Sequence, residues 1–205
     1  MKLQAYSERF VFAVTYWVPK LIVLQFIWLL HALPIVTIVR ASQSLLLTIH
    51  RCQQTHGEKV FSIYRHIFQT HLQQSRKRTF LLSIYSFLLV FDIWFFFRID
   101  KPYGYILSYS LLIASYFILL LFIYQTLLND EKGVRTRLIA VFYLFFKFPR
   151  FVVLHLLLTV GILLGFLLIG PIYAFLLGIS LFFFLHNQIF CLKVNFYEKN
   201  YQRIH

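Results

Sequence analysis

Five stretches of this chain are long and apolar enough to cross a lipid bilayer, and they constrain its fold more than any other feature. A spanning helix needs about 20 mostly apolar residues to cross about 30 Å of hydrocarbon, where only helices and closed barrels satisfy the backbone. We therefore expect an all-α protein with a single membrane domain over residues 1–205, a polytopic helix bundle with additional interfacial amphipathic helices. The predicted transmembrane helices are residues 20–39, 80–97, 104–128, 151–169 and 171–192.

The overall composition also favours a membrane protein over a soluble one. Hydrophobic residues make up 60% of the chain and charged residues 13%, whereas soluble domains usually carry about 25% charged residues. The net charge of +13 is compatible with nucleic-acid binding, but a basic chain without a soluble fold is better suited to anionic lipid headgroups. We expect the lipid bilayer, and no nucleic acid, among its partners.

Basic residues are concentrated in two long connections between the predicted spans. Residues 40–79 carry many Lys and Arg residues against the single acid Glu58, and residues 129–150 carry several against Asp130 and Glu131. Cytoplasmic loops of membrane proteins carry this excess of positive charge. The pattern therefore places both connections and the C-terminus in the cytoplasm and the N-terminus outside.

The N-terminal apolar region, Phe10 to Ile49, is too long for one span and short for two. We interpret residues 1–19 as a helix lying at the outer interface, and residues 41–51 as a continuation of the first span into the cytoplasmic interface. The alternative divides the region at Pro34 into two short spans and reverses the N-terminus. A single kinked span is favoured, because proline kinks a membrane helix more readily than it ends one.

An amphipathic helix is predicted within the first cytoplasmic connection. Phe61, Tyr64, Phe68 and Leu72 follow one another at helical spacing, with basic and amide residues between them. Such a helix can lie along the inner leaflet with its apolar side towards the lipid. It can equally form a lid on the cytoplasmic ends of the bundle, or a docking surface for another protein.

The second predicted span contains an acid, Asp92, close to its outer end. Gln25 of the first span is expected at a similar depth, and Lys20 and Arg98 can reach towards this level. One hypothesis makes Asp92 a proton or cation relay. Because a relay normally needs several ionisable groups across the bilayer, we favour a structural strut bonded to neighbouring spans, or a contact with a partner protein.

A second polar layer is predicted near the inner surface, formed by Gln125, His155, His186, Asn187 and Gln188. Two histidines at one level are not a complete metal-ligand set, so hydrogen bonds between helices are the favoured interpretation. We predict no metal, no cofactor and no catalytic residue.

The fourth span contains the segment GILLG, in which Gly161 and Gly165 lie on one helix face. Small residues at this spacing allow another helix to approach closely. We expect these glycines to line a helix contact, either within the bundle, where Gly178 and Ser180 are candidates, or with a partner subunit.

Motifs of known catalytic chemistry are missing from the sequence. There is no phosphate-binding loop, no H-E-x-x-H segment and no nucleophile with a base and an acid at one depth, so we predict that the protein is not an enzyme. Cys52 and Cys191 are expected on the cytoplasmic side as free thiols.

Three segments resemble a known family: FIWLLHALPIVTIVRASQSLL, VFSIYRHIFQTHLQQSRKRTFLLSIYSFLLVFDIWFFF and RLIAVFYLFFKFPRFVVLHLLL. They look like the YesL family of small bacterial membrane proteins, and the likeness runs from about Phe26 to Phe190. The resemblance implies a location in the bacterial cell membrane and an auxiliary role beside carbohydrate ABC importers. The chain lacks the glycine-containing coupling loop of importer permeases, which implies an attendant of the permease subunits rather than a permease.

Three functional hypotheses follow from these observations. The first is a non-enzymatic accessory subunit that docks on a membrane complex through protein–protein interaction, with a carbohydrate ABC importer as the expected partner. The second is a small independent transporter or channel that uses Asp92. The third is a membrane partner of a sensor kinase.

Overall fold

The computed structural model is helical throughout the part of the chain that it describes, which is residues 2–55, 59–74, 76–127, 141–142, 145–147 and 149–201. No strand occurs in these residues. The named helices are α1 (Lys2–Ala32), η1 (Ile35–Thr37), α2 (Ile38–Gln54), α3 (Val60–Gln74), α4 (Arg76–Phe97), α5 (Pro102–Leu127), α7 (Pro149–Ile169) and α8 (Pro171–Tyr201). The predicted all-α fold is confirmed.

Five helices in the described residues are long and apolar enough to cross a membrane. These segments are Val14–Ala32, Thr79–Phe97, Pro102–Leu127, Pro149–Ile169 and Ile172–Cys191. Helices α5, α7 and α8 each begin at a proline. Proline suits the first helical position because the N–H that it lacks would have no partner there. The structure thus supports a multi-pass membrane protein.

The first span ends earlier than predicted, because the chain reverses direction around Pro34. Helix α1 runs without interruption from Lys2 and ends at Ala32. Pro34 cannot donate a backbone hydrogen bond to α1, and the Thr37 hydroxyl donates instead to the carbonyl of His31, 2.5 Å away. The prediction that residues 20–39 form one span is therefore wrong, and so is the separation of residues 1–19 as an interfacial helix.

Helix α2 folds back along α1 instead of continuing it. The Trp28 indole N–H on α1 donates to the hydroxyl of Ser42 on α2 at 3.1 Å, and the two helices are packed together. The prediction that residues 41–51 extend the first span is therefore wrong. The alternative of two short spans located the break correctly at Pro34, but α2 is not among the helices long and apolar enough to cross a membrane.

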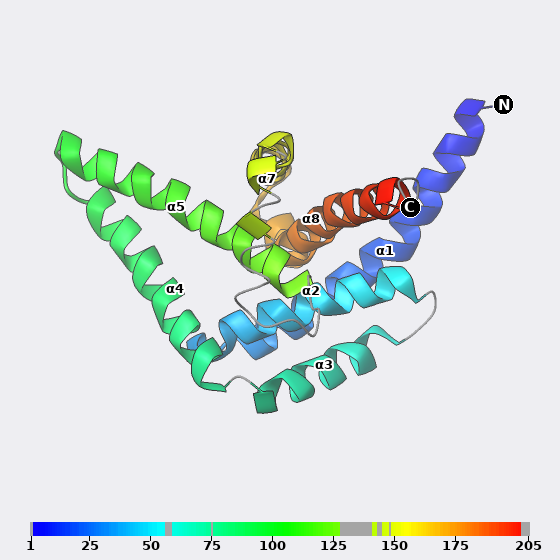
Figure 1. Ribbon diagram of the computed structural model, residues 1–205, viewed down its shortest axis with the longest axis horizontal. Coiled ribbons are helices and arrows are strands. Elements are labelled where there is room, and N and C mark those ends of the chain that lie inside the picture. The colour runs from blue at the N-terminus through cyan, green and yellow to red at the C-terminus, as the bar shows by residue number, and fades with distance from the viewer. Residues whose placement is uncertain are drawn as a thin grey trace.

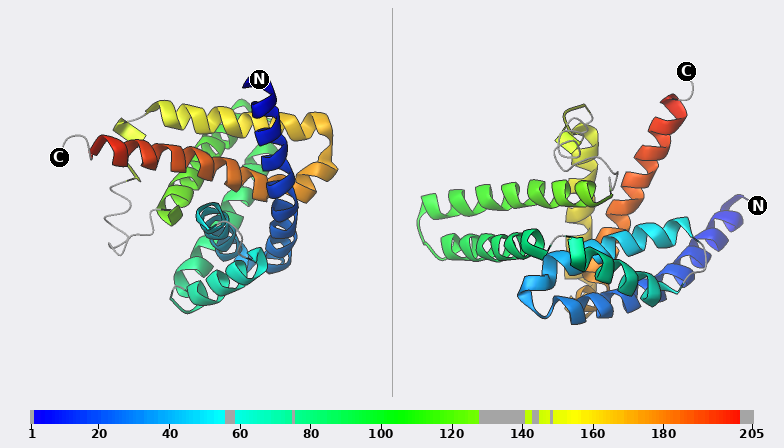
Figure 2. Two further views of the ribbon diagram at one scale, coloured as in Figure 1. Left: turned by 90° about the vertical axis from the view of Figure 1, so that its right-hand side faces the viewer. Right: turned by 60° about the horizontal axis from the view of Figure 1, so that its bottom comes forward.

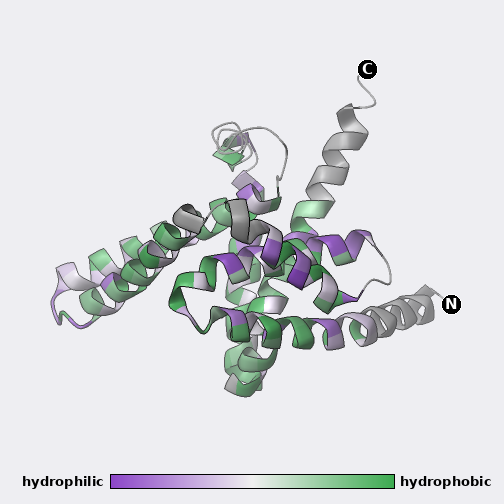
Figure 3. Cartoon of the chain, turned by 90° about the horizontal axis from the view of Figure 1, so that it is seen from below, coloured by the Kyte–Doolittle hydropathy of each residue, from purple (hydrophilic) through white to green (hydrophobic). Residues whose placement is uncertain are grey.

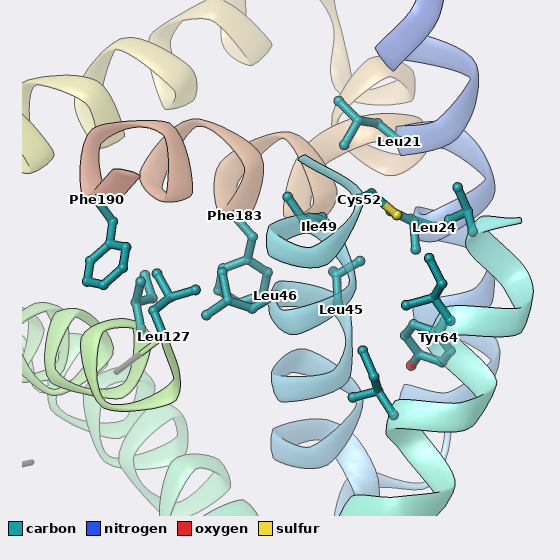
Figure 4. Close-up of a cluster of buried hydrophobic side chains, with 14 of the residues drawn as sticks. Leu21, Leu24, Leu45, Leu46, Ile49, Cys52, Tyr64, Leu127, Phe183 and Phe190 are labelled. Atoms are coloured by element: carbon teal, nitrogen blue, oxygen red, sulfur yellow. The ribbon is translucent and has the colours of Figure 1, made fainter. Parts of the chain in front are cut away.

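Helix α2 lies at the centre of the protein, although residues 40–79 were predicted only as a connection. It packs against α1, α3, α4, α5 and α8. Leu45, Leu46 and Ile49 are fully buried, and Figure 4 shows them between side chains of α1 and of α8. The main hydrophobic cluster is therefore built around a short amphipathic helix, and not around the most apolar ones.

Helices α4 and α5 form one hairpin, and helices α7 and α8 form another; both contact α2 and project beyond it (Figure 1). The α4–α5 hairpin closes tightly at Gly104, where an added Cβ would lie 2.6 Å from the carbonyl oxygen of Ile99. The α7–α8 hairpin turns at Gly170, whose φ of 121° is readily adopted only by glycine. In the right-hand view of Figure 2, α4 and α5 run across the picture while α7 stands nearly upright. The hairpins thus diverge from one another.

The diverging hairpins leave much apolar surface uncovered by the rest of the chain. Figure 3 shows the α4–α5 hairpin, at the left, mostly in the hydrophobic colour. Only 6% of the residues in the span of α4, and 6% in the span of α7, are buried within the protein. Lipid is the natural environment for such surfaces.

Candidate functional site: polar contacts between helices and the outward faces of α4 and α7

Gln25 joins α1 to α8. Its side-chain oxygen accepts a hydrogen bond of 2.9 Å from the backbone N–H of Ser180, and both residues are buried. Gln25, one candidate partner of Asp92 because of its expected depth, therefore bonds to α8 instead. Depth along the span does not select the partner of Gln25, because its side chain points towards α8 and not towards α4.

Asp92 lies on the exposed surface of α4 and forms no hydrogen bond or ion pair with any described residue. The two predicted cationic partners lie over aromatic rings near them in the sequence. The Lys20 ammonium is 3.7 Å from the ring centroid of Tyr16, and the Arg98 guanidinium is 5.4 Å from that of Trp94. Asp92 is therefore not a strut inside the described part of this chain.

A buried cluster of polar side chains connects α5, α7 and α8. The Tyr124 hydroxyl lies 2.7 Å from His155 Nε2, and the rings of His155 and His186 stack with centroids 4.8 Å apart. His186 Nδ1 is 2.9 Å from the carbonyl of Phe182 and must therefore donate to it. The Thr159 hydroxyl lies 3.3 Å from His186 Nε2 and donates its proton to the carbonyl of His155 at 2.9 Å.

The predicted inner polar layer thus brings its two histidines together through hydrogen bonds and ring contacts. Among the described residues, no group of three or more His, Cys, Asp and Glu side chains lies close enough to hold a metal ion. The cluster contains hydroxyl and imidazole groups only, which suits it to fixing the relative positions of the three helices.

Asn187 binds to α2 rather than to the histidine cluster. Its side-chain oxygen lies 3.0 Å from His50 Nδ1, and its side-chain nitrogen donates to Gln53 at 2.6 Å. Gln54 lies 3.1 Å from His50 Nε2. A neutral His50 with its proton on Nδ1 satisfies both contacts. Burial lowers the pKa of His50, and the hydrogen bond with Asn187 opposes this shift.

Sequence reasoning missed this contact because α2 was interpreted as the end of a span. The signal was present in the sequence. Leu45, Leu46 and Ile49 repeat at helical spacing, with His50 and Gln53 one and four residues beyond Ile49. This pattern is typical of an amphipathic helix that buries one face and carries polar groups at its edge.

Helix α3 packs as a lid on α1 and α2. Tyr64 is buried, its hydroxyl donates to the carbonyl of Ala41 at 3.5 Å, and burial raises the pKa of this phenol. Its ring stacks on that of Phe68 at 6.0 Å, and the His31 ring lies 4.5 Å from that of Phe68. The Arg40 guanidinium lies over the same ring at 5.0 Å.

The buried side of α3 is turned relative to the predicted one. Val60, Ile63 and Ile67 are buried together with Tyr64, while Phe61 is 57% exposed. The aliphatic residues pack into the core, so Phe61 lies outside the lid contact, and its predicted contact with lipid or a partner stays a prediction. The side chain of Leu72 lies outside the described residues.

Gly161 and Gly165 make no close contact with another helix in the part of the chain that the structure describes. A Cβ added at either position would meet nothing within 4 Å, and the same is true of Gly178. The expected contact of these glycines within the bundle, with Gly178 and Ser180 as candidates, is therefore wrong. A contact with a partner subunit stays a prediction.

Both cysteines are free, as predicted, with Cys52 buried and Cys191 partly exposed. The Cys191 thiol lies 3.8 Å from His50 Nδ1 and 3.9 Å from the side-chain oxygen of Gln53. The two thiols therefore add no covalent link between helices.

Comparison with known proteins adds no assignment to these observations. No protein-family model, no curated protein and no solved structure matches this chain. Membership of the YesL family therefore stays a prediction.

Proposed function

We propose that the protein is a non-enzymatic, multi-pass membrane subunit that docks laterally on a larger membrane complex. The observation that carries the proposal is that only 6% of the residues in each of the spans of α4 and α7 are buried within the protein. Both helices present long apolar surfaces away from the α2 core. A helix that leaves most of its apolar surface exposed in its own chain is available to pack against a helix of another.

Lipid alone is a poor match for two features of these surfaces. Asp92 lies on the exposed surface of α4, and a carboxylate in contact with acyl chains has no hydrogen-bond donor. Gly161 and Gly165 leave a shallow strip on α7 with open space beyond it, and such strips allow close helix approach. A partner helix satisfies both features.

The resemblance to the YesL family extends this proposal to a class of partner. It points to a carbohydrate ABC importer in a bacterial cell membrane, with this chain beside the permease subunits. This step rests on the likeness of the quoted segments and on the family's usual neighbours, and no contact in the structure specifies a permease.

The transporter alternative, in which Asp92 lies in a pathway, fits the geometry less well. Ionisable residues of transport pathways face the bundle interior or a water-filled cavity. Asp92 faces away from the core, and the buried histidines lie on other helices, α7 and α8. We therefore favour a docking role for Asp92.

Purification from the native membrane in a mild detergent tests the proposed function. Stoichiometric recovery of permease and solute-binding subunits is the expected result. Recovery of a sensor kinase would keep lateral docking and replace the importer as the partner. A chain that purifies without any partner, and that transports a substrate in vesicles, would contradict the proposal and restore the transporter alternative.

A further inference from the structure

We infer that the outward side of α4 binds a transmembrane helix of another protein, and that this helix carries a lysine or arginine at the level of Asp92. The inference rests on the proposed function and specifies the surface and the chemistry of the partner. The surface, called here the α4 stripe, consists of Leu81, Tyr85, Leu88, Asp92 and Phe95.

The α4 stripe follows one side of the helix. Its members are separated by four, three, four and three residues, which is the spacing of a single helix face. All are exposed, and the four other than Asp92 expose between 49% and 65% of their surface. Thr79 and Ser83 are buried on the other side of α4, and the Ile93 carbonyl accepts from Ser108 of α5 at 3.4 Å. The stripe therefore points away from the rest of the chain.

The depth of Asp92 places its carboxylate among acyl chains rather than in water. Asp92 is five residues from Phe97, the last residue of the span, which corresponds to about 8 Å along the helix axis. The short side chain of Asp92 cannot bridge that distance to the membrane interface. A charge at this depth needs a partner, because acyl chains offer neither donors nor counter-ions.

Among the described residues, the three cations at the outer ends of the first spans do not pair with Asp92. Lys20 and Arg98 are held over aromatic rings, and the Lys101 ammonium lies 5.8 Å from the ring centroid of Tyr103, next to the α4–α5 turn. Asp92 forms no ion pair with any of them. We therefore assign the complementary charge to another molecule.

A second polar group lies on the same stripe. Tyr85 is 53% exposed, and its hydroxyl has no hydrogen-bond partner among the described residues. It lies seven residues before Asp92, which is two helical turns, or about 10 Å. A partner helix packed along the stripe therefore meets a carboxylate and a phenol in register, which fixes its position along α4.

A second copy of this chain is a poor occupant of the stripe. A symmetric pair would bring two Asp92 carboxylates together, and like charges in a low-dielectric environment repel strongly. A basic side chain on a different protein neutralises the charge and donates hydrogen bonds. Charge complementarity thus selects a heterologous partner.

Photo-crosslinking of the full chain in its native membrane tests the inference. A benzophenone residue is placed at position 88, on the stripe, and as a control at position 90, where Val90 is 64% exposed but points nearly to the opposite side. We expect position 88 to crosslink to a membrane-spanning segment that contains a lysine or arginine within one turn of the crosslink, and position 90 to crosslink to lipid.

Charge variants give the second part of the test. We expect Asp92→Lys to reduce the crosslink from position 88 by about tenfold or more, without changing the stability of the purified chain, because Asp92 is exposed and forms no hydrogen bond or ion pair with the described residues. Replacing the partner's cation by aspartate in the Asp92→Lys background is expected to restore the crosslink.

Four results would overturn the inference: crosslinks from position 88 to a second copy, to lipid only, or to a segment without a basic residue, or no effect of Asp92→Lys. A crosslinker at position 163 separates these failures from failure of the proposed function, because Leu163 is 59% exposed on α7. Capture of a protein from position 163 alone would reject the α4 stripe and leave lateral docking intact. Crosslinks to lipid only, from positions 88 and 163 alike, would reject the α4 stripe and also the proposed lateral docking.

Discussion

The central position of α2 predicts a large loss of stability for Leu45→Ala. Leu45 is fully buried at the contact of α2 with its neighbours. The substitution removes three carbon groups at about 0.8 kcal/mol each, about 2.4 kcal/mol of transfer free energy. The cavity left in a packed core adds to this cost, so we expect a total loss of about 3–4 kcal/mol.

Thermal unfolding of the purified protein in one detergent, followed by tryptophan fluorescence, measures this effect. Leu167→Ala on α7 is the matched control, since Leu167 is 79% exposed and the same atoms are removed. We expect the control to change the free energy of unfolding by less than about 0.5 kcal/mol. Equal losses for the two variants would show that α2 is a surface element, and would refute the reasoning.

Three further predictions concern α3, the α2–α8 contact and α7. Phe68→Ala is expected to destabilise the protein by about 2–4 kcal/mol, because it removes the ring contacts with Tyr64 and His31. Phe61→Ala should change the stability by less than about 0.5 kcal/mol, and the reverse order in thermal unfolding would contradict the lid arrangement. Burial lowers the pKa of His50, so the unfolded chain binds a proton at this imidazole more tightly than the folded chain does. The folding stability that depends on neutral His50 should therefore be fully present above about pH 6.5 and fall as the pH drops below it. An unchanged pH dependence in His50→Gln would assign the effect to another group. Gly165→Leu should leave the stability of the isolated chain unchanged, because its Cβ meets nothing within 4 Å, and should reduce recovery of partner subunits; full recovery would exclude Gly165 from the docking surface.

The lengths of the spans were predictable from the sequence, because a segment inside lipid must be mostly apolar and must have its backbone hydrogen bonds satisfied within a helix. Residues 80–97 and 104–128 differ from the corresponding structural segments, Thr79–Phe97 and Pro102–Leu127, by at most two residues at each end. The first span was less predictable. Whether Pro34 kinks or ends a helix depends on groups that replace the lost hydrogen bonds, here the Thr37 hydroxyl.

Contacts between side chains were harder to predict than their depths in the membrane. The depth of a residue follows from its position along a span, whereas its contacts depend on which side of the helix its side chain lies. His186 and Asn187 are consecutive in the sequence and were expected in one layer. Consecutive residues of a helix point about 100° apart. His186 therefore meets His155 of α7, while Asn187 meets His50 of α2. For the same reason, the level of Asp92 in its span could not indicate that it faces outward.

The contact between His50 and Asn187 also bears on how the protein is made. The two residues are separated by 137 positions, so α2 leaves the ribosome long before the helix that completes its surroundings. During synthesis, α2 is a short amphipathic helix that is not apolar enough to insert into lipid alone. We expect it to stay at the membrane surface until its packing partners are made. Closing so long a loop adds little entropic cost beyond that of a shorter one. Insertion of the apolar spans can therefore come first, with the core assembling only when the last helix arrives.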